Sequence, residues 1–403
     1  MPHALRHVLH ELQLALLKVL IRLLPGSRAP VLFAGAGSAL QLCNAIADLG
    51  TRRVLVVTDA VLVRLGIVTP IVEALRGRGI SCEVYDGVEP DPTHAQVEAG
   101  IGIARQAGSE AVLAVGGGSP MDAGKIIAAC VANGVAPAAI VGNFKVKQDP
   151  LPIYAIPTTA GTGAEVTVAA VVTDTVARAK LAVVDGKLVP RMAALDGSLM
   201  LGLPRSVTAA SGMDALTHAV ESFLSRFADE KTRPLSLTAT RMVFAHLPRA
   251  CAGGEDLAAR QSMALAATYA GMAFSRASVG YVHAIAHNLG GLYHTPHGLA
   301  NAIVLPHILD FYAQAAAAQL AELGRAIGVA DERTPEAQAV SAFISAVRAL
   351  AREVGIPERL DSLRPSDIPE LARRAMAEAQ GFYPVPRFMS PQQCESILQK
   401  LLP

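Results

Sequence analysis

The sequence contains no tryptophan, and only 4% of its 403 residues are aromatic and 17% charged. Basic and acidic side chains number 35 and 34, so the formal net charge is +1. Such a balance creates no single-sign field that would gather nucleic acid or an anionic membrane, and we expect no nucleic-acid partner. Hydrophobic residues make up 52% of the chain, which supports a large buried core and argues against disorder.

Cysteines are few, and no apolar run is long. The five cysteines are scattered, odd in number and never spaced as C-x-x-C, which is typical of small buried side chains in a reducing compartment. The longest apolar run, Leu12 to Leu24, is interrupted by Lys18 and Arg22 and is shorter than the about 20 residues that a bilayer requires. No small-residue cleavage site follows it. We therefore predict a cytoplasmic protein without a transmembrane segment.

Residues 1–28 are expected to form a separate amphipathic element. Leucine and valine recur at helical spacing over 5–24, and Pro25-Gly26 ends the pattern. The broad apolar face predicts packing against the same domain or against a second subunit. A helix that lies on a membrane surface is the alternative.

Short apolar runs alternate with helical stretches between residues 29 and 203. Strands are expected at Val31–Ala34, Val54–Thr58, Cys82–Tyr85, Ala111–Val115, Ile153–Pro157, Thr167–Thr173, Leu181–Val184 and Ala193–Leu195, and helices at 38–49, 67–78, 93–107 and 119–132. This alternation predicts an α/β domain with a parallel sheet covered on both faces. From 204 to 403 the periodicity is helical, which predicts an all-helical domain.

A glycine-rich turn follows the strand that ends at Val115. In Gly116-Gly117-Gly118-Ser119 the backbone N–H groups can approach an anion, and the next helix adds its positive N-terminal end. We predict Ser119 as the N-cap and Pro120 as the first helical residue. The turn is not a Walker A loop, because Ser119 and Ile126 stand where that motif needs Gly and Ser or Thr. A glycine-rich turn that binds no ligand is the alternative.

Asp59 follows another of the expected strands. A carboxylate at the end of a parallel strand can accept a hydrogen bond from a ribose hydroxyl and can repel a 2′-phosphate. It can equally cap the helix that follows, and the position alone does not separate the two roles.

The histidines are strongly clustered. Five of the 11 fall in one short window: His283, His287, His294, His297 and His307. Upstream, Asp214 and His218 are four residues apart in a helical stretch, so both side chains face one side and can hold one ion. A carboxylate with imidazoles suits Zn²⁺ or Fe²⁺ and disfavours Ca²⁺ or Mg²⁺. A lone histidine is more often structural, but this clustering predicts a metal site.

Four stretches together resemble the iron-containing (group III) alcohol dehydrogenases. They are Gly-Gly-Gly-Ser-Pro-Met-Asp at 116–122, Ile-Pro-Thr-Thr-Ala-Gly-Thr-Gly-Ala-Glu-Val-Thr at 156–167, Gly-Met-Asp-Ala-Leu-Thr-His-Ala at 212–219, and the run from Gly280 to Pro306. The resemblance implies a Rossmann-like dinucleotide-binding domain over 29–203 and an all-helical metal-binding domain over 204–403. It also implies catalysis in a cleft between the two domains.

Carried over residue by residue, the resemblance assigns the site. It implies that Asp214, His218, His283 and His297 are the metal ligands, with Fe²⁺ as the ion and Zn²⁺ as the alternative. It implies that NAD contacts Asp59, Asp91, Gly117, Gly118, Ser119, Asp122, Thr158, Thr159, Thr162, Thr167 and Lys180. His287 matches a histidine beside the metal; we expect it to relay a proton, and a role limited to hydrogen bonding is the alternative.

These assignments give the functional hypothesis of an NAD-dependent alcohol dehydrogenase or aldehyde reductase. The metal would act as a Lewis acid on the oxygen of a small alcohol or aldehyde, and a hydride would pass to or from the nicotinamide. A glycerol-dehydrogenase-like or dehydroquinate-synthase-like enzyme is the first alternative, although basic residues are few around the histidines. A non-catalytic assembly-forming or membrane-attached module is the second. We expect a homodimer or larger homo-oligomer.

Overall fold

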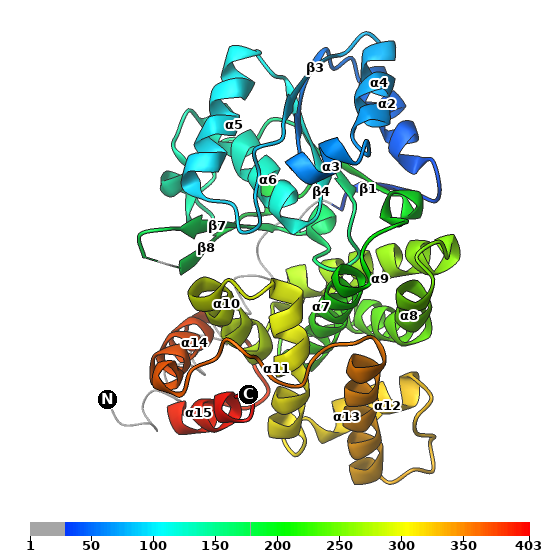
Figure 1. Ribbon diagram of the computed structural model, residues 1–403, viewed down its shortest axis with the longest axis vertical. Coiled ribbons are helices and arrows are strands. Elements are labelled where there is room, and N and C mark those ends of the chain that lie inside the picture. Colours follow the sequence, from blue (N-terminus) through cyan, green and yellow to red (C-terminus); the bar gives the residue numbers. More distant parts are fainter. Residues whose placement is uncertain (1–28, 178) are drawn as a thin grey trace. The chain divides into compact units, whose positions relative to one another are not determined.

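The computed structural model describes residues 29–177 and 179–403 (Figure 1). The helix predicted over 1–28 lies outside the described residues. The described chain divides into two compact units: a sheet unit of residues 29–203 and 254–271, and a helical unit of residues 204–253 and 272–403. The domain limits of 29–203 and 204–403 that the sequence pattern indicates stay a prediction.

The described residues of the sheet unit form two sheets. A six-stranded parallel sheet has the order β1-β9-β6-β4-β2-β3, and a three-stranded sheet has the order β5-β8-β7 with β7 and β8 antiparallel. The strands are β1 (Val31–Ala34), β2 (Arg53–Val57), β3 (Ser81–Tyr85), β4 (Ala111–Gly116), β5 (Gly142–Asn143), β6 (Ile153–Pro157), β7 (Ala169–Asp174), β8 (Ala179–Val184) and β9 (Met192–Leu195). The predicted parallel sheet is confirmed.

Helices cover both faces of the parallel sheet. They are α2 (Ser38–Asp48), α3 (Ala60–Arg64), α4 (Thr69–Gly77), α5 (His94–Gln106) and α6 (Gly118–Asn133), with the 3-10 helices η1 (Pro137–Ile140), η2 (Ala164–Val166), η3 (Gly186–Leu188) and η4 (Gly197–Met200). Strand β2 shows why both faces are apolar. Its Leu55 and Val57 pack with α5 and α6, whereas Val54 and Val56 pack with α2, α3 and α4.

Every regular element of the helical unit is a helix. The elements are α7 (Arg205–Leu224), α8 (Thr232–Ala252), α10 (Tyr281–Tyr293), α11 (His297–Tyr312), α12 (Ala317–Ala326), α13 (Glu336–Glu353), η5 (Pro365–Asp367), α14 (Ile368–Phe382) and α15 (Pro391–Gln399). Helix α9 (Leu257–Ala277) contributes residues 257–271 to the sheet unit and residues 272–277 to the helical unit. In the part of the chain that the structure describes, no helix combines the length and the apolarity needed to cross a bilayer.

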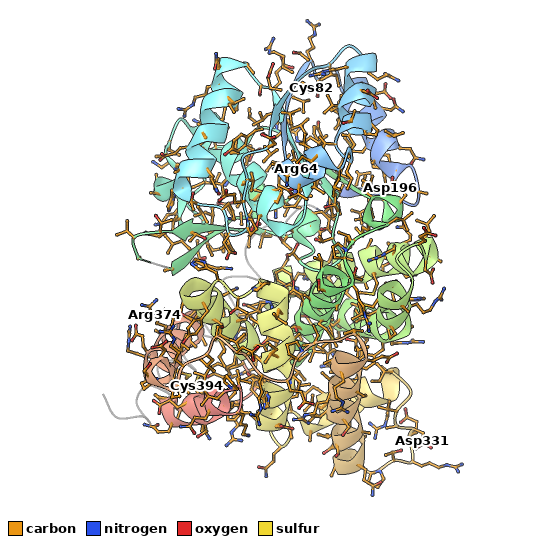
Figure 2. All side chains as sticks on the ribbon, in the orientation of Figure 1. Arg64, Cys82, Asp196, Asp331, Arg374 and Cys394 are labelled. Carbon is orange, nitrogen blue, oxygen red and sulfur yellow. The ribbon has the colours of Figure 1, made fainter. Side chains whose placement is uncertain are left out.

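The five cysteines are all free and buried. Cys82 lies on β3 in the sheet unit and Cys394 on α15 in the helical unit (Figure 2). Burial raises the pKa of the Cys394 thiol to about 12, and it raises that of Cys82 to about 11. Both thiols are therefore protonated near neutral pH and act as small apolar side chains, as the scattered spacing predicted.

Candidate metal centre and cofactor loop

Helix α7 supplies two of the four predicted metal ligands. The helix is buried continuously from Gly212 to its end. A Cβ on Gly212 would lie 2.2 Å from Leu247 Cδ1, so glycine lets α8 pack close against α7. Asp214 and His218 lie one turn apart, with 3.8 Å between Asp214 Oδ2 and His218 Nδ1. The core packing therefore holds a carboxylate and an imidazole side by side inside the unit.

The other two predicted ligands come from α10 and α11. His283 lies in the first turn of α10, and His297 is the first residue of α11. A Cβ on Gly298 would lie 2.4 Å from the Ala210 carbonyl oxygen of α7. Glycine at this position therefore permits the close approach of α11 to α7 that brings His297 to Asp214.

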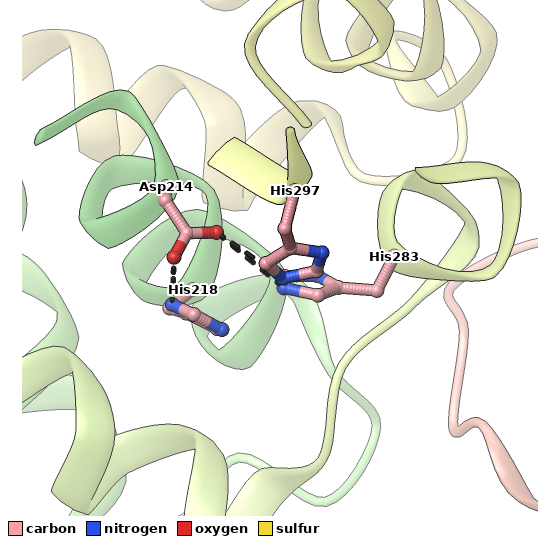
Figure 3. A group of neighbouring side chains, drawn as sticks. All are labelled: Asp214, His218, His283 and His297. Atoms are coloured by element: carbon pink, nitrogen blue, oxygen red, sulfur yellow. Dashed lines mark ion pairs between the residues drawn. The ribbon is translucent and has the colours of Figure 1, made fainter. Parts of the chain in front are cut away.

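The four side chains converge on one point (Figure 3). One ligand atom from each of Asp214, His218, His283 and His297 lies within 4.8 Å of the ligand atoms of the other three. Asp214 Oδ1 is 3.5 Å from His297 Nε2 and 4.0 Å from His283 Nε2. His297 is partly exposed, whereas the other three are buried. Among the four side chains, exposure to solvent is thus confined to His297.

The chemistry of the cluster fits an iron ion. Burial lowers the pKa of His283 well below its ordinary value, and the neighbouring His218, His297 and His287 lower it further. A neutral imidazole is the form that binds a metal ion. One carboxylate with three imidazole nitrogens is a donor set that first-row divalent ions such as Fe²⁺ accept and that Mg²⁺ or Ca²⁺ disfavour.

The glycine-rich turn joins β4 to α6 in the sheet unit. A Cβ on Gly117 would lie 3.3 Å from Thr159 Oγ1, and a Cβ on Gly118 would lie 2.9 Å from Thr162 Cγ2. Glycines therefore let the turn approach two of the threonines predicted to contact NAD. A third, Thr158, is buried and donates its backbone N–H to the Gly116 carbonyl at 3.0 Å.

The predicted cap of α6 is wrong. The N-cap is Gly117, and the helix begins at Gly118, one residue before Ser119. Pro120 still fits the first turn, where its missing N–H costs no hydrogen bond. The Ser119 hydroxyl instead accepts a hydrogen bond from the backbone N–H of Asp91 at 3.2 Å. The side chain that was predicted to cap the helix is therefore bonded to a residue 28 positions earlier in the sequence.

Asp91, Ser119 and Lys180 form one hydrogen-bonded group. Asp91 has a left-handed backbone, with φ of 60°, and its Oδ1 accepts a hydrogen bond from Lys180 Nζ at 2.6 Å. The structure thus places three predicted cofactor residues together, from the loop before α5, the start of α6 and strand β8.

The buried Lys125 interacts with two further predicted cofactor residues, Thr167 and Asp122. Lys125 donates to the Thr167 hydroxyl at 2.8 Å and to the carbonyls of Thr167 and Ala169 at 2.9 Å. Burial lowers the pKa of Lys125 and raises that of Asp122. Lys125, which follows the glycine motif, therefore links α6 to the start of β7, and Thr167 accepts two of its hydrogen bonds.

Asp59 is the N-cap of α3. Its Oδ1 accepts the backbone N–H groups of Val61 at 2.9 Å and Leu62 at 3.0 Å. The capping role is thus present in the structure, and a role toward the ribose stays a prediction.

Comparison with known proteins decides the family. The model of iron-containing alcohol dehydrogenases matches residues 29–197, and the model of the C-terminal part of the Fe-containing alcohol dehydrogenase family matches residues 208–402. The chain belongs to the iron-containing alcohol dehydrogenase family. The family predicted from the four sequence stretches is therefore confirmed.

Two individual relatives and one solved structure support the same family. Lactaldehyde reductase of Escherichia coli (strain K12) is 39% identical over 347 residues, which cover 85% of this chain and 90% of the relative. The 1,3-propanediol dehydrogenase of Citrobacter freundii is 39% identical over 338 residues, which cover 83% of this chain and 87% of the relative. A crystal structure of 1,3-propanediol oxidoreductase has a TM-score of 0.90 at 35% identity and covers 94% of this chain and 100% of its own. As a family member, the chain is an oxidoreductase that acts on alcohols and aldehydes with NAD and iron.

Three residues around the candidate metal site were not predicted. The first is Glu221, which is buried on α7 one turn beyond His218. Its Oε2 lies 2.6 Å from His283 Nδ1 and accepts the Gly280 N–H at 2.9 Å, while Oε1 accepts the Val282 N–H at 2.7 Å. Burial raises the pKa of Glu221, and the hydrogen bonds that it accepts from Gly280 and Val282 lower it. A sequence signal existed, because the spacing His218-x-x-Glu221 puts both on one helix face.

The second is Asn301, one turn after His297 on α11. Its Nδ2 donates to Asp214 Oδ1 at 2.7 Å and lies 3.2 Å from Nε2 of both His283 and His297. This amide therefore links three of the four predicted ligands.

The third is Glu378 on α14, whose Oε1 lies 2.7 Å from Nδ1 of His287. The ring of His287 stacks on that of His297, with 5.2 Å between ring centroids. His287 is thus next to the four side chains without being one of them.

Proposed function

We propose that this chain is an iron- and NAD-dependent dehydrogenase of small alcohols and diols, or in reverse a reductase of the corresponding aldehydes. The observation that carries the proposal is the convergence of Asp214, His218, His283 and His297 on one point. The relatives named lactaldehyde reductase and 1,3-propanediol dehydrogenase support a substrate of about three carbons that carries more than one oxygen.

We assign the metal site to the helical unit and the NAD contacts to the sheet unit. Asp214, His218, His283 and His297 hold the ion, which when bound supplies a Lewis acid for the substrate oxygen. The NAD contacts are Asp59, Asp91, Gly117, Gly118, Ser119, Asp122, Thr158, Thr159, Thr162, Thr167 and Lys180. His287 accepts the proton that the alcohol loses when its hydride passes to the nicotinamide.

An anaerobic assay of the iron-loaded enzyme tests the function. NADH formation would be followed with 1,2-propanediol, 1,3-propanediol, ethanol and butanol, and NADH consumption with the matching aldehydes. We expect turnover that is lost when a chelator removes the ion and returns when iron is added back. A protein that binds iron and NAD but turns over no alcohol or aldehyde would contradict the proposal.

We also propose that the protein forms a homo-oligomer and that it lies in the cytoplasm. Strand β1 is an edge strand of the parallel sheet, and Val31 on it is 59% exposed. An open edge with an apolar side chain supports a homodimer or larger homo-oligomer, which light scattering coupled to gel filtration would measure. The five free, buried cysteines support a reducing compartment, the cytoplasm.

A further inference from the structure

Helix α14 supplies a carboxylate to a histidine on α10. Glu378 Oε1 lies 2.7 Å from His287 Nδ1 and accepts the Tyr383 hydroxyl at 2.7 Å. Glu378 Oε2 accepts Asn288 Nδ2 at 3.3 Å, and the same amide donates to the Ala284 carbonyl at 2.8 Å. Three side chains from two segments thus fix the carboxylate in place.

These contacts determine where the proton of His287 sits. Burial, with the neighbouring carboxylate, raises the pKa of Tyr383 well above its ordinary value, so its hydroxyl keeps its proton and donates. An ionised carboxylate only accepts hydrogen bonds, so the nitrogen that faces it must carry a hydrogen. In neutral His287 that nitrogen is Nδ1, and Nε2 is left with the lone pair.

The position of the ring suits a proton acceptor. It stacks on His297 at an interplanar angle of 16° and meets His283 edge-on with 5.8 Å between centroids. The side chain of His287 is 22% exposed and that of Glu378 is 30% exposed. The pair therefore adjoins the predicted metal ligands and is partly exposed to solvent.

We propose that Glu378 is a positioning residue for the reaction, because it holds His287 as the tautomer whose Nε2 can accept a proton. The inference rests on the proposed function of His287. During oxidation the alcohol gives its hydride to NAD⁺ and its proton to Nε2, and the products are the carbonyl compound, NADH and the imidazolium. The Glu378 carboxylate then faces the positive ring through Nδ1–H and stabilises it. In reduction the imidazolium returns the proton.

A double-mutant cycle tests this role in the iron-loaded enzyme. Glu378→Gln is expected to keep iron content and KM and to lower kcat about 10- to 100-fold, the usual range for a group that orients another. In the His287→Ala background the same change is expected to lower kcat no further, since its target is gone. Glu370→Gln is the matched control: it makes the same change on the same helix, at a carboxylate that pairs with Arg373 and Arg374, and should leave kcat unchanged.

Two kinetic results would overturn the proposal. One is an unchanged kcat in Glu378→Gln, and the other is an equal loss in the wild-type and His287→Ala backgrounds, which would show a structural effect independent of His287.

A spectroscopic readout keeps the test independent of turnover. In the zinc-loaded protein labelled with ¹⁵N-histidine, the signals that disappear in His287→Gln are expected to show a protonated Nδ1 and an unprotonated Nε2. Protonation on Nε2 would overturn the proposal even if Glu378→Gln fails to fold. If the wild type turns over no alcohol, the proposed function fails, and the spectrum still decides the tautomer.

Discussion

Glu221 shows how a single buried side chain holds a histidine of the candidate metal site. It faces Nδ1 of His283, so the other ring nitrogen of His283 is the one directed at Asp214. Gly280 allows this contact, because a Cβ at that position would lie 2.8 Å from Glu221 Oε1. A carboxylate that holds a ligating histidine by its second nitrogen fixes the ring and its tautomer.

Replacing Glu221 should therefore weaken metal binding without unfolding the protein. For Glu221→Gln we expect iron affinity to fall about 10- to 100-fold, measured by competition with a chromophoric chelator. Glu230→Gln makes the same change at an exposed position of the same unit and should leave the affinity unchanged. Equal affinities in Glu221→Gln and the wild type would show that Glu221 does not support the site.

Asp59 carries a prediction about cofactor choice. Its charge is expected to disfavour the 2′-phosphate of NADP, so the wild type should prefer NAD. Asp59→Asn removes the charge but keeps an oxygen that can cap α3, so the preference should narrow with little loss of stability. Asp59→Gly should narrow it as well and also remove the side-chain cap. The ratio of kcat/KM for the two cofactors measures the effect, and a wild type with equal values would refute the prediction.

Local spacing predicted some of these residues but not others. Asp214 and His218 are separated by one helical turn, so their proximity follows from the sequence. Glu221 and His283, which are in contact, are 62 residues apart in the sequence. Glu378 and His287, which are also in contact, are 91 residues apart. Those contacts depend on how α7, α10 and α14 pack, which periodicity does not specify.

At the scale of elements, the approach of α11 to α7 depends on Gly298. For Gly298→Ala, the Cβ meets the Ala210 backbone, which cannot rotate away as a side chain could. We expect α11 to shift, iron affinity to fall at least 10-fold and the free energy of unfolding to decrease by about 1–3 kcal/mol. Gly102→Ala on α5 has open space and is the control, with stability unchanged or raised by at most about 1 kcal/mol. Wild-type iron affinity in Gly298→Ala would contradict this account of the helix contact.

The sequence predicted most elements because their patterns are strong. The apolar runs of β2 and β4 and the helical periods of α2, α5 and α6 coincide with the structure within one or two residues. Helix α3 was not predicted, since five residues are too few to establish a helical period. The start of α6 was misplaced because the Ser119 hydroxyl bonds Asp91 rather than its own helix. Errors thus lie where tertiary contacts decide between local alternatives.

At the scale of the whole molecule, residues 1–26 should matter for stability or assembly and not for chemistry. Seven or so leucine and valine side chains on one face would gain about 1.5–3 kcal/mol each if buried, before the entropy of ordering is subtracted. We expect deletion of residues 1–26 to lower the melting temperature or change the oligomeric state, while iron content and NAD binding stay the same. An unchanged melting temperature and oligomeric state would refute a packing role, and loss of binding to lipid vesicles on deletion would favour the membrane alternative.

The central claim is that Asp214, His218, His283 and His297 hold one catalytic iron ion. Its most direct test is the iron content of protein purified without oxygen, measured together with turnover in the wild type, His283→Ala and His297→Ala. We predict about one iron per chain in the wild type, and loss of both iron and turnover in each variant with the circular dichroism spectrum preserved. Wild-type iron content in both variants would contradict the assignment of the metal site.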